Sequence, residues 1–163
     1  LADPGGWVVY KHPDQLFSVR FPGKPVVADQ SKQAAGTMAR VESATFIDGD
    51  HALVATGGLY TSTAKFDINE AMDRMLNAWV ARWKGRVIAQ KTMTLDGFQG
   101  REVQFTAPGP YAKPLRATAR VFASSKPPSS YLVIAFQMDG TPDANAPKFL
   151  DSLHLGTKVE TKP

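Results

Sequence analysis

The stretch Tyr131-Leu132-Val133-Ile134-Ala135-Phe136 says most about how this chain folds. Its six apolar residues do not alternate with polar ones, which is typical of a strand that is covered on both faces. We therefore expect the centre of a β-sheet here. The run is far shorter than the roughly 18 apolar residues of a membrane-spanning helix, and no other stretch reaches that length.

Further strand candidates precede this run along the chain. They are short apolar or alternating segments at 7–10, 17–21, 38–46, 52–60, 87–95, 101–106 and 115–122. In the last of them Arg116 and Arg120 share one face while small apolar residues share the other, so we expect one side of that strand to meet water.

Glycine and proline mark the connections between these strands. Asp48-Gly49-Asp50 predicts a tight hairpin, and residues 96–100 are short enough for another. The Pro-Gly-Lys-Pro sequence at 22–25 predicts a loop that continues to about Gly36. Gly57-Gly58 predicts a bulge or a bend within its strand. Such short connections favour antiparallel pairing.

Two segments have the spacing of helices. One apolar face of the first is formed by Met72, Met75, Leu76, Trp79, Val80 and Trp83. Asp67, with Glu70 three residues later, predicts its N-terminal cap, and Gly85 is where a left-handed terminator is expected. The second helix is expected to begin near Thr141 or Asn145. Its apolar face comprises Ala146, Phe149, Leu150 and Leu153.

This order of elements predicts an α+β fold, a mostly antiparallel β-sheet with two main helices packed on it. We expect a single domain over residues 7–155, with flexible termini at 1–6 and 156–163. The composition agrees with a globular chain, because 163 residues with 43% hydrophobic and 21% charged residues can bury a sizeable core.

The sequence opens at Leu1 rather than at Met and contains no Cys. Such a start is typical of an exported protein after removal of a signal peptide, or of a trimmed chain, and we expect a periplasmic or secreted protein. The absence of Cys excludes thiol nucleophiles, dithiol redox pairs and Cys-ligated metals.

Candidate catalytic and metal-binding motifs are weak. The three histidines, His12, His51 and His154, lie far apart without metal-ligand spacing, so we expect surface or strand-end residues. Asp48, Asp50 and His51 come nearest to a metal cluster, but the other ligands of a calcium loop are missing. Nucleophile-elbow and phosphate-loop motifs are absent. The sequence predicts no enzyme, no metal site and no cofactor.

Charge is distributed unevenly along the chain. Residues 74–126 hold ten Lys and Arg against two acidic residues, a net charge of +8 in a chain of net charge +4. The candidate interaction surface comprises Arg116, Arg120, Arg101, Tyr111 and Lys113, the last two in a proline-rich loop. The alternative is structural, with Arg116 and Arg120 paired across the sheet to Glu102 or its neighbours.

A second candidate site lies on the first helix. Trp79, Trp83 and Met75 could line a ligand cleft between this helix and the sheet. The alternative is that the same stripe of Trp and Met simply belongs to the core.

Several segments together resemble the PsbP-like α/β/α family. They are Leu16-Phe17-Ser18-Val19-Arg20-Phe21-Pro22, the Trp-bearing helix, Gly100-Arg101-Glu102 at the start of a strand, and Phe149-Leu150-Asp151-Ser152-Leu153. The resemblance extends from about Trp7 to Leu155. It implies a layered fold and a non-enzymatic, partner-binding domain, often secreted or lipid-anchored, although this chain lacks a Cys for an anchor. No family site residue matches a position here.

We therefore expect an exported binding protein that contacts a protein partner or an anionic envelope component, and not nucleic acid. The sequence leaves two alternatives open, a carrier of a small ligand and a hydrolase with an unrecognised site. It does not indicate an oligomeric state.

Overall fold

The computed structural model describes residues 6–31, 38–61, 66–109, 113–138 and 140–156. Strand β9 (Pro128–Met138) is the central strand of a seven-stranded antiparallel sheet, and all six residues of 131–136 are buried. Tyr131, Val133 and Ala135 pack into one hydrophobic cluster, while the residues between them pack into another on the opposite face. The prediction of a strand covered on both faces is confirmed.

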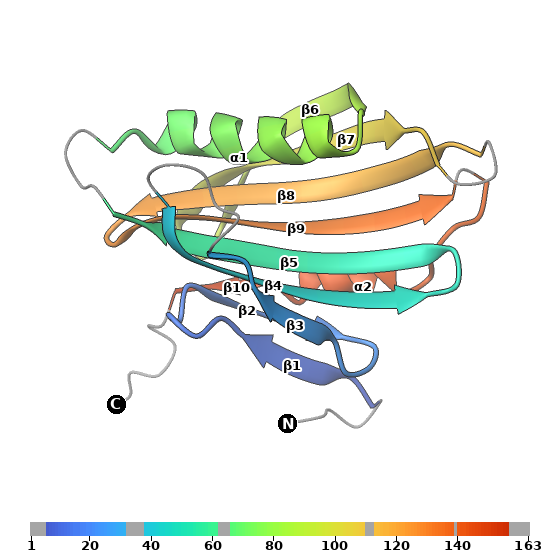
Figure 1. Cartoon of the computed structure of the whole chain (residues 1–163), viewed down its shortest axis with the longest axis horizontal. Coiled ribbons are helices and arrows are strands. Elements are labelled where there is room, and N and C mark those ends of the chain that lie inside the picture. The colour runs from blue at the N-terminus through green and yellow to red at the C-terminus, as the bar shows by residue number, and fades with distance from the viewer. Residues whose placement is uncertain (1–5, 32–37, 62–65, 110–112, 139, 157–163) are drawn as a thin grey trace.

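The large sheet has the strand order β3-β4-β5-β9-β8-β7-β6 (Figure 1). Its other members are β3 (Val26–Asp29), β4 (Met38–Asp48), β5 (His51–Tyr60), β6 (Arg86–Leu95), β7 (Phe98–Ala107) and β8 (Leu115–Ser125). Consecutive strands from β3 to β5 and from β6 to β9 pair as antiparallel neighbours, and β5 pairs with β9. Both predicted hairpins, across Gly49 and across Gly97, are confirmed.

Helix α1 (Ile68–Arg82) covers one face of this sheet (Figure 1). Met72, Met75 and Leu76 are buried against β8 and its neighbours, where every second residue is small and apolar. The carboxylate of Asp67 accepts a hydrogen bond from the Glu70 N–H at 3.0 Å, which confirms the predicted cap.

The C-terminus of α1 differs from the prediction in one residue. Lys84, with φ of 55°, adopts the left-handed conformation that we expected at Gly85. The Gly85 N–H donates to the Val80 carbonyl and the Lys84 N–H donates to the Ala81 carbonyl, which together form a Schellman motif. Gly85 serves another purpose, because a Cβ there would lie 2.8 Å from Phe105 Cδ1.

A second, three-stranded sheet and helix α2 (Ala146–Asp151) cover the opposite face (Figure 1). The small sheet contains β1 (Val8–Lys11), β2 (Phe17–Phe21) and β10 (His154–Leu155) in the order β1-β2-β10. The predicted α+β fold with two helices on a mostly antiparallel sheet is therefore confirmed, and this second sheet is an addition to it.

Two local predictions are wrong. Strand β3 lies within the predicted loop from 22 to 36; its side chains are exposed, so no apolar alternation marks it, and backbone pairing to β4 forms it. Gly57 and Gly58 pair in regular register, without a bulge. A Cβ on Gly57 would lie 2.9 Å from both Phe17 Cε2 and Tyr131 Cβ, so the glycine permits close packing.

Gly156 belongs to the fold, because its N–H donates to the Leu16 carbonyl at 3.0 Å. The predicted flexibility of the other terminal residues concerns 1–5 and 157–163, which lie outside the described residues; the remaining one, Gly6, is exposed. None of the helices described here is long and apolar enough to cross a membrane.

Candidate functional site

On the predicted basic face of β8, Arg120 is paired with carboxylates. Arg116 and Arg120 lie on the same face, away from α1, as expected. The Nε of Arg120 is 2.9 Å from Glu102 Oε2, and its Nη1 donates to Asp151 Oδ1 at 3.1 Å and to the Leu150 carbonyl at 3.2 Å. The structural alternative, in which Arg120 pairs across the sheet with Glu102, is thus confirmed.

Arg101 does not join this face. It is the cross-strand partner of Val121, and cross-strand partners share a face, so Arg101 lies on the α1 side of the sheet. There it pairs with Asp73 of the helix. Lys113 is exposed just before β8, and Tyr111 lies outside the described residues. The residues of the candidate surface are therefore divided between the two faces of the sheet. The sequence did not predict this division, because the register of β7 against β8 cannot be read from it.

The predicted cleft between α1 and the sheet is present. Its volume is about 610 Å³ and its apolar walls include Ile47, Val54, Trp79, Trp83, Phe136 and Met138. The rings of Trp83 and Phe136 pack 4.9 Å apart, which fixes the position of the indole. Met75 does not line the cleft, because it is buried in the core beside it.

The rim of this cleft carries charged groups. Arg82 Cζ lies 5.2 Å from the centroid of the Trp79 ring, a cation–π contact at the edge of the cleft. Lys84 and Arg86 follow within four residues of Arg82. Among the residues that the structure describes, none of these three cations has an acidic partner. Asp50 adds a single carboxylate to the lining.

His12 departs from the expectation of a surface residue, since only 1% of it is exposed. Its Nδ1 accepts a hydrogen bond from the Asp14 N–H at 3.1 Å, so Nε2 carries the proton and donates to the Gly57 carbonyl at 3.0 Å. Desolvation lowers the pKa of the imidazole below its ordinary value, although the Gly57 carbonyl opposes this. No spacing in the sequence indicates this burial.

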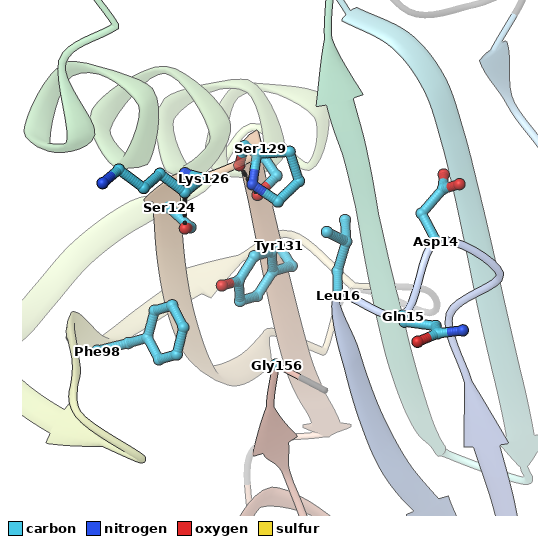
Figure 2. Close-up of a pocket in the computed structure, with 10 residues that line it drawn as sticks. Asp14, Gln15, Leu16, Phe98, Ser124, Lys126, Ser129, Tyr131 and Gly156 are labelled. Carbon is cyan, nitrogen blue, oxygen red and sulfur yellow. Dashed lines mark hydrogen bonds between the residues drawn. The ribbon is translucent and has the colours of Figure 1, made fainter. Parts of the chain in front are cut away.

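A second pocket, which the sequence did not indicate, lies on the face of the sheet opposite α1 (Figure 2). Its volume is about 460 Å³, and Tyr131 of the central strand forms part of its wall. The residues around it come from the β1–β2 loop, the start of β7, the β8–β9 hairpin and the end of β10, so only the folded chain brings them together. No group of three or more potential metal ligands occurs in the described ranges.

Comparison with known proteins finds similarity at the level of structure. No family model and no curated protein sequence matches the chain. The solution structure of cyanobacterial PsbP from Synechocystis matches with a TM-score of 0.61 and 12% identity, over 94% of each chain. The Saccharomyces cerevisiae Ran-binding protein Mog1p matches with a TM-score of 0.52 and 10% identity, over 92% of this chain and 95% of that one. This chain therefore has the PsbP-like fold that its sequence resembled.

Proposed function

We propose that this protein is a non-enzymatic, exported binding protein that receives an acidic segment of a partner protein in the cleft between α1 and the large sheet. The observation that supports this most is the open cleft of about 610 Å³ with aromatic walls and, at its rim, Arg82, which has no acidic partner among the described residues. Aromatic residues and Arg are the groups that contribute most to binding at protein interfaces.

Exposed apolar side chains in the cleft and beyond it favour a macromolecular occupant. Ile47 is 70% exposed and Trp83 is 37% exposed, and both belong to the cleft. Val87 and Ile88, directly after the basic segment, are also more than 40% exposed. A small ligand in the cleft would leave Val87 and Ile88 in water, whereas a protein segment can extend past the rim and cover them.

The charged residues near the rim indicate that the partner segment carries negative charge. Arg82 lines the cleft and Lys84 and Arg86 follow it closely in the chain, so cations outnumber the Asp50 carboxylate around the helix terminus. If a large apolar side chain of the partner segment enters the cleft, acidic residues next to it in that segment would lie close to these cations. Because the cations are exposed, the attraction should weaken as salt screens it.

Peptide selection tests this proposal. Random peptides displayed on phage are selected against the immobilised protein, and the enriched sequences should combine a large apolar residue with Asp or Glu. A synthetic copy of the best peptide should bind the R82E/K84E variant about tenfold or more weakly at low salt, because the introduced carboxylates repel the acidic residues of the peptide.

Arg74→Glu provides the matched control, because Arg74 is an exposed cation on the same helix that does not line the cleft. It should leave peptide affinity nearly unchanged. Equal affinity for R82E/K84E and wild type, or equal losses in both variants, would count against the cleft as the site.

One observation favours a second candidate, the carrier of a small ligand. The volume of the cleft lies within the range of roughly 300–1,000 Å³ that is common for ligand pockets. Native mass spectrometry of gently purified protein would detect a retained small molecule, and a uniformly ligand-free mass would argue against a carrier.

A further inference from the structure

A tyrosine hydroxyl with no hydrogen-bond partner among the described residues faces the pocket on the α2 side of the sheet. Tyr131 is 3% exposed, and its ring is stacked on Phe17 and Phe122 at 5.7 and 6.4 Å. Among the described residues its hydroxyl makes no hydrogen bond, and Figure 2 shows it directed into the pocket, towards Ser124 and Phe98. Because the ring is fixed by packing and its hydroxyl is open to the pocket, a ligand atom in the pocket can form a hydrogen bond with it.

Two serines of the β8–β9 hairpin lie in the same pocket, and their hydrogen bonds show which of them can still donate to a ligand. Ser124 Oγ accepts a hydrogen bond from the Lys126 N–H at 3.2 Å, which leaves the hydroxyl proton of Ser124 available. Ser129 uses its proton to bond the Pro127 carbonyl at 2.9 Å. The Lys126 ammonium is exposed at the rim, on a side chain long enough to change its position.

Desolvation raises the pKa of the Tyr131 phenol, so this group remains a proton donor at neutral pH. The donors near Tyr131 are thus two hydroxyls, and the Lys126 ammonium, which points away from Tyr131 in Figure 2, becomes a third if its side chain turns inward. This part of the pocket is suited to a hydrogen-bond acceptor that carries negative charge.

The acidic residue of the lining does not oppose this assignment. Asp14 Oδ1 is paired with Arg40 at 2.8 Å, and its Oδ2 is buried without a hydrogen-bond partner among the described residues. In Figure 2 its carboxylate points away from Tyr131, beyond Leu16. The apolar contacts near Tyr131 come from Phe98 and Leu16, which leave room for a hydrophobic body.

We propose that this pocket binds a small monocarboxylate with an apolar or aromatic body. The carboxylate would accept hydrogen bonds from Tyr131 and Ser124 and pair with Lys126, while the body packs against Phe98 and Leu16. The site lies on the opposite side of the sheet from the α1 cleft, so it does not depend on the proposed protein-binding function.

Nuclear magnetic resonance titration with phenylacetate, and with its neutral amide as the comparison, tests the proposal. Phenylacetate should shift the amide resonances of Leu16, Phe98, Ser124, Ser129 and Gly156 and should bind more tightly than the amide. The variant Y131F keeps the stacked ring, and it should bind phenylacetate about tenfold more weakly because a hydrogen bond to a charged group is lost.

Two further variants make the outcome decisive. Tyr60→Phe removes a hydroxyl that is bonded to Ser130 at 3.0 Å and packs on the α1 side, so it should bind like wild type. Lys126→Met, at an exposed position, should remove the preference for carboxylate over amide. The proposal is overturned if roughly 10 mM phenylacetate causes no shifts, if shifts occur only at the α1 cleft, or if Y131F and K126M both bind like wild type.

Discussion

His12 is the residue whose environment most directly couples folding to pH. Its imidazole is buried and donates to Gly57 while accepting from the Asp14 N–H, so the neutral form satisfies both ring nitrogens. Protonation would place a second N–H against the Asp14 N–H, where it has no acceptor. The folded state therefore favours the neutral ring, in agreement with the lowered pKa.

Acidification should destabilise the protein through this histidine. The folded-state pKa lies below the ordinary unfolded value near 6.5, so the unfolded chain takes up the proton first as the pH falls. The free energy of unfolding should decrease below about pH 6.5, by at most about 1.4 kcal/mol per pH unit until the folded ring is also protonated. Urea unfolding at about pH 7.5 and pH 5 measures this difference.

The comparison of two variants isolates His12. His12→Gln should flatten the pH dependence, whereas His154→Gln, at an exposed position, should retain it. If H12Q loses as much stability between the two pH values as wild type does, another group is responsible.

At the scale of elements, Arg120 connects strand β8 to helix α2. Its guanidinium joins Glu102 on β7 to the C-terminal turn of α2 through the Leu150 carbonyl and the Asp151 carboxylate. Only 18% of the Arg120 side chain is exposed, so these charge-assisted hydrogen bonds are partly shielded from solvent. Arg120, which the sequence suggested for partner binding, thus stabilises the contact between the sheet and α2.

Arg120→Met should lower the free energy of unfolding by about 1–3 kcal/mol, because Glu102 loses its nearer cationic partner and α2 loses two hydrogen bonds. Arg74→Met, which breaks an exposed pair within α1, should change it by about 0.5 kcal/mol or less. Urea denaturation gives both values. A neutral R120M variant would contradict the structural role.

Elements with a clear apolar period could be predicted from the sequence, and those formed by pairing alone could not. The apolar run of β9 and the helical stripe from Met72 to Trp79 determine which side is buried, so both elements lie where expected. Strand β3 has no buried side chain, and its existence depends on the edge of β4. The same limit applies to the site: Trp79 and Trp83 were found by periodicity, whereas Arg101 was assigned to the wrong face.

At the scale of the whole molecule, the positive charge becomes concentrated by pairing. Four cations of the basic segment are neutralised by carboxylates: Arg74 by Glu70, Lys91 and Arg120 by Glu102, and Arg101 by Asp73. Arg82, at the end of α1, has no carboxylate partner among the described residues and lies beside an aromatic cleft. Folding thus leaves part of the charge of 74–126 beside the cleft in which we propose that a partner binds.

Site-specific photo-crosslinking in the source organism tests the binding proposal most directly. A benzophenone amino acid at position 83 replaces an aromatic side chain of the cleft, and the same group at position 11 lies at the exposed end of β1 in the small sheet. We predict a protein crosslinked from position 83 and not from position 11, and its loss in the R82E/K84E background. Crosslinks of equal yield from both positions, or none from position 83, would contradict the assignment of the cleft as the partner-binding site.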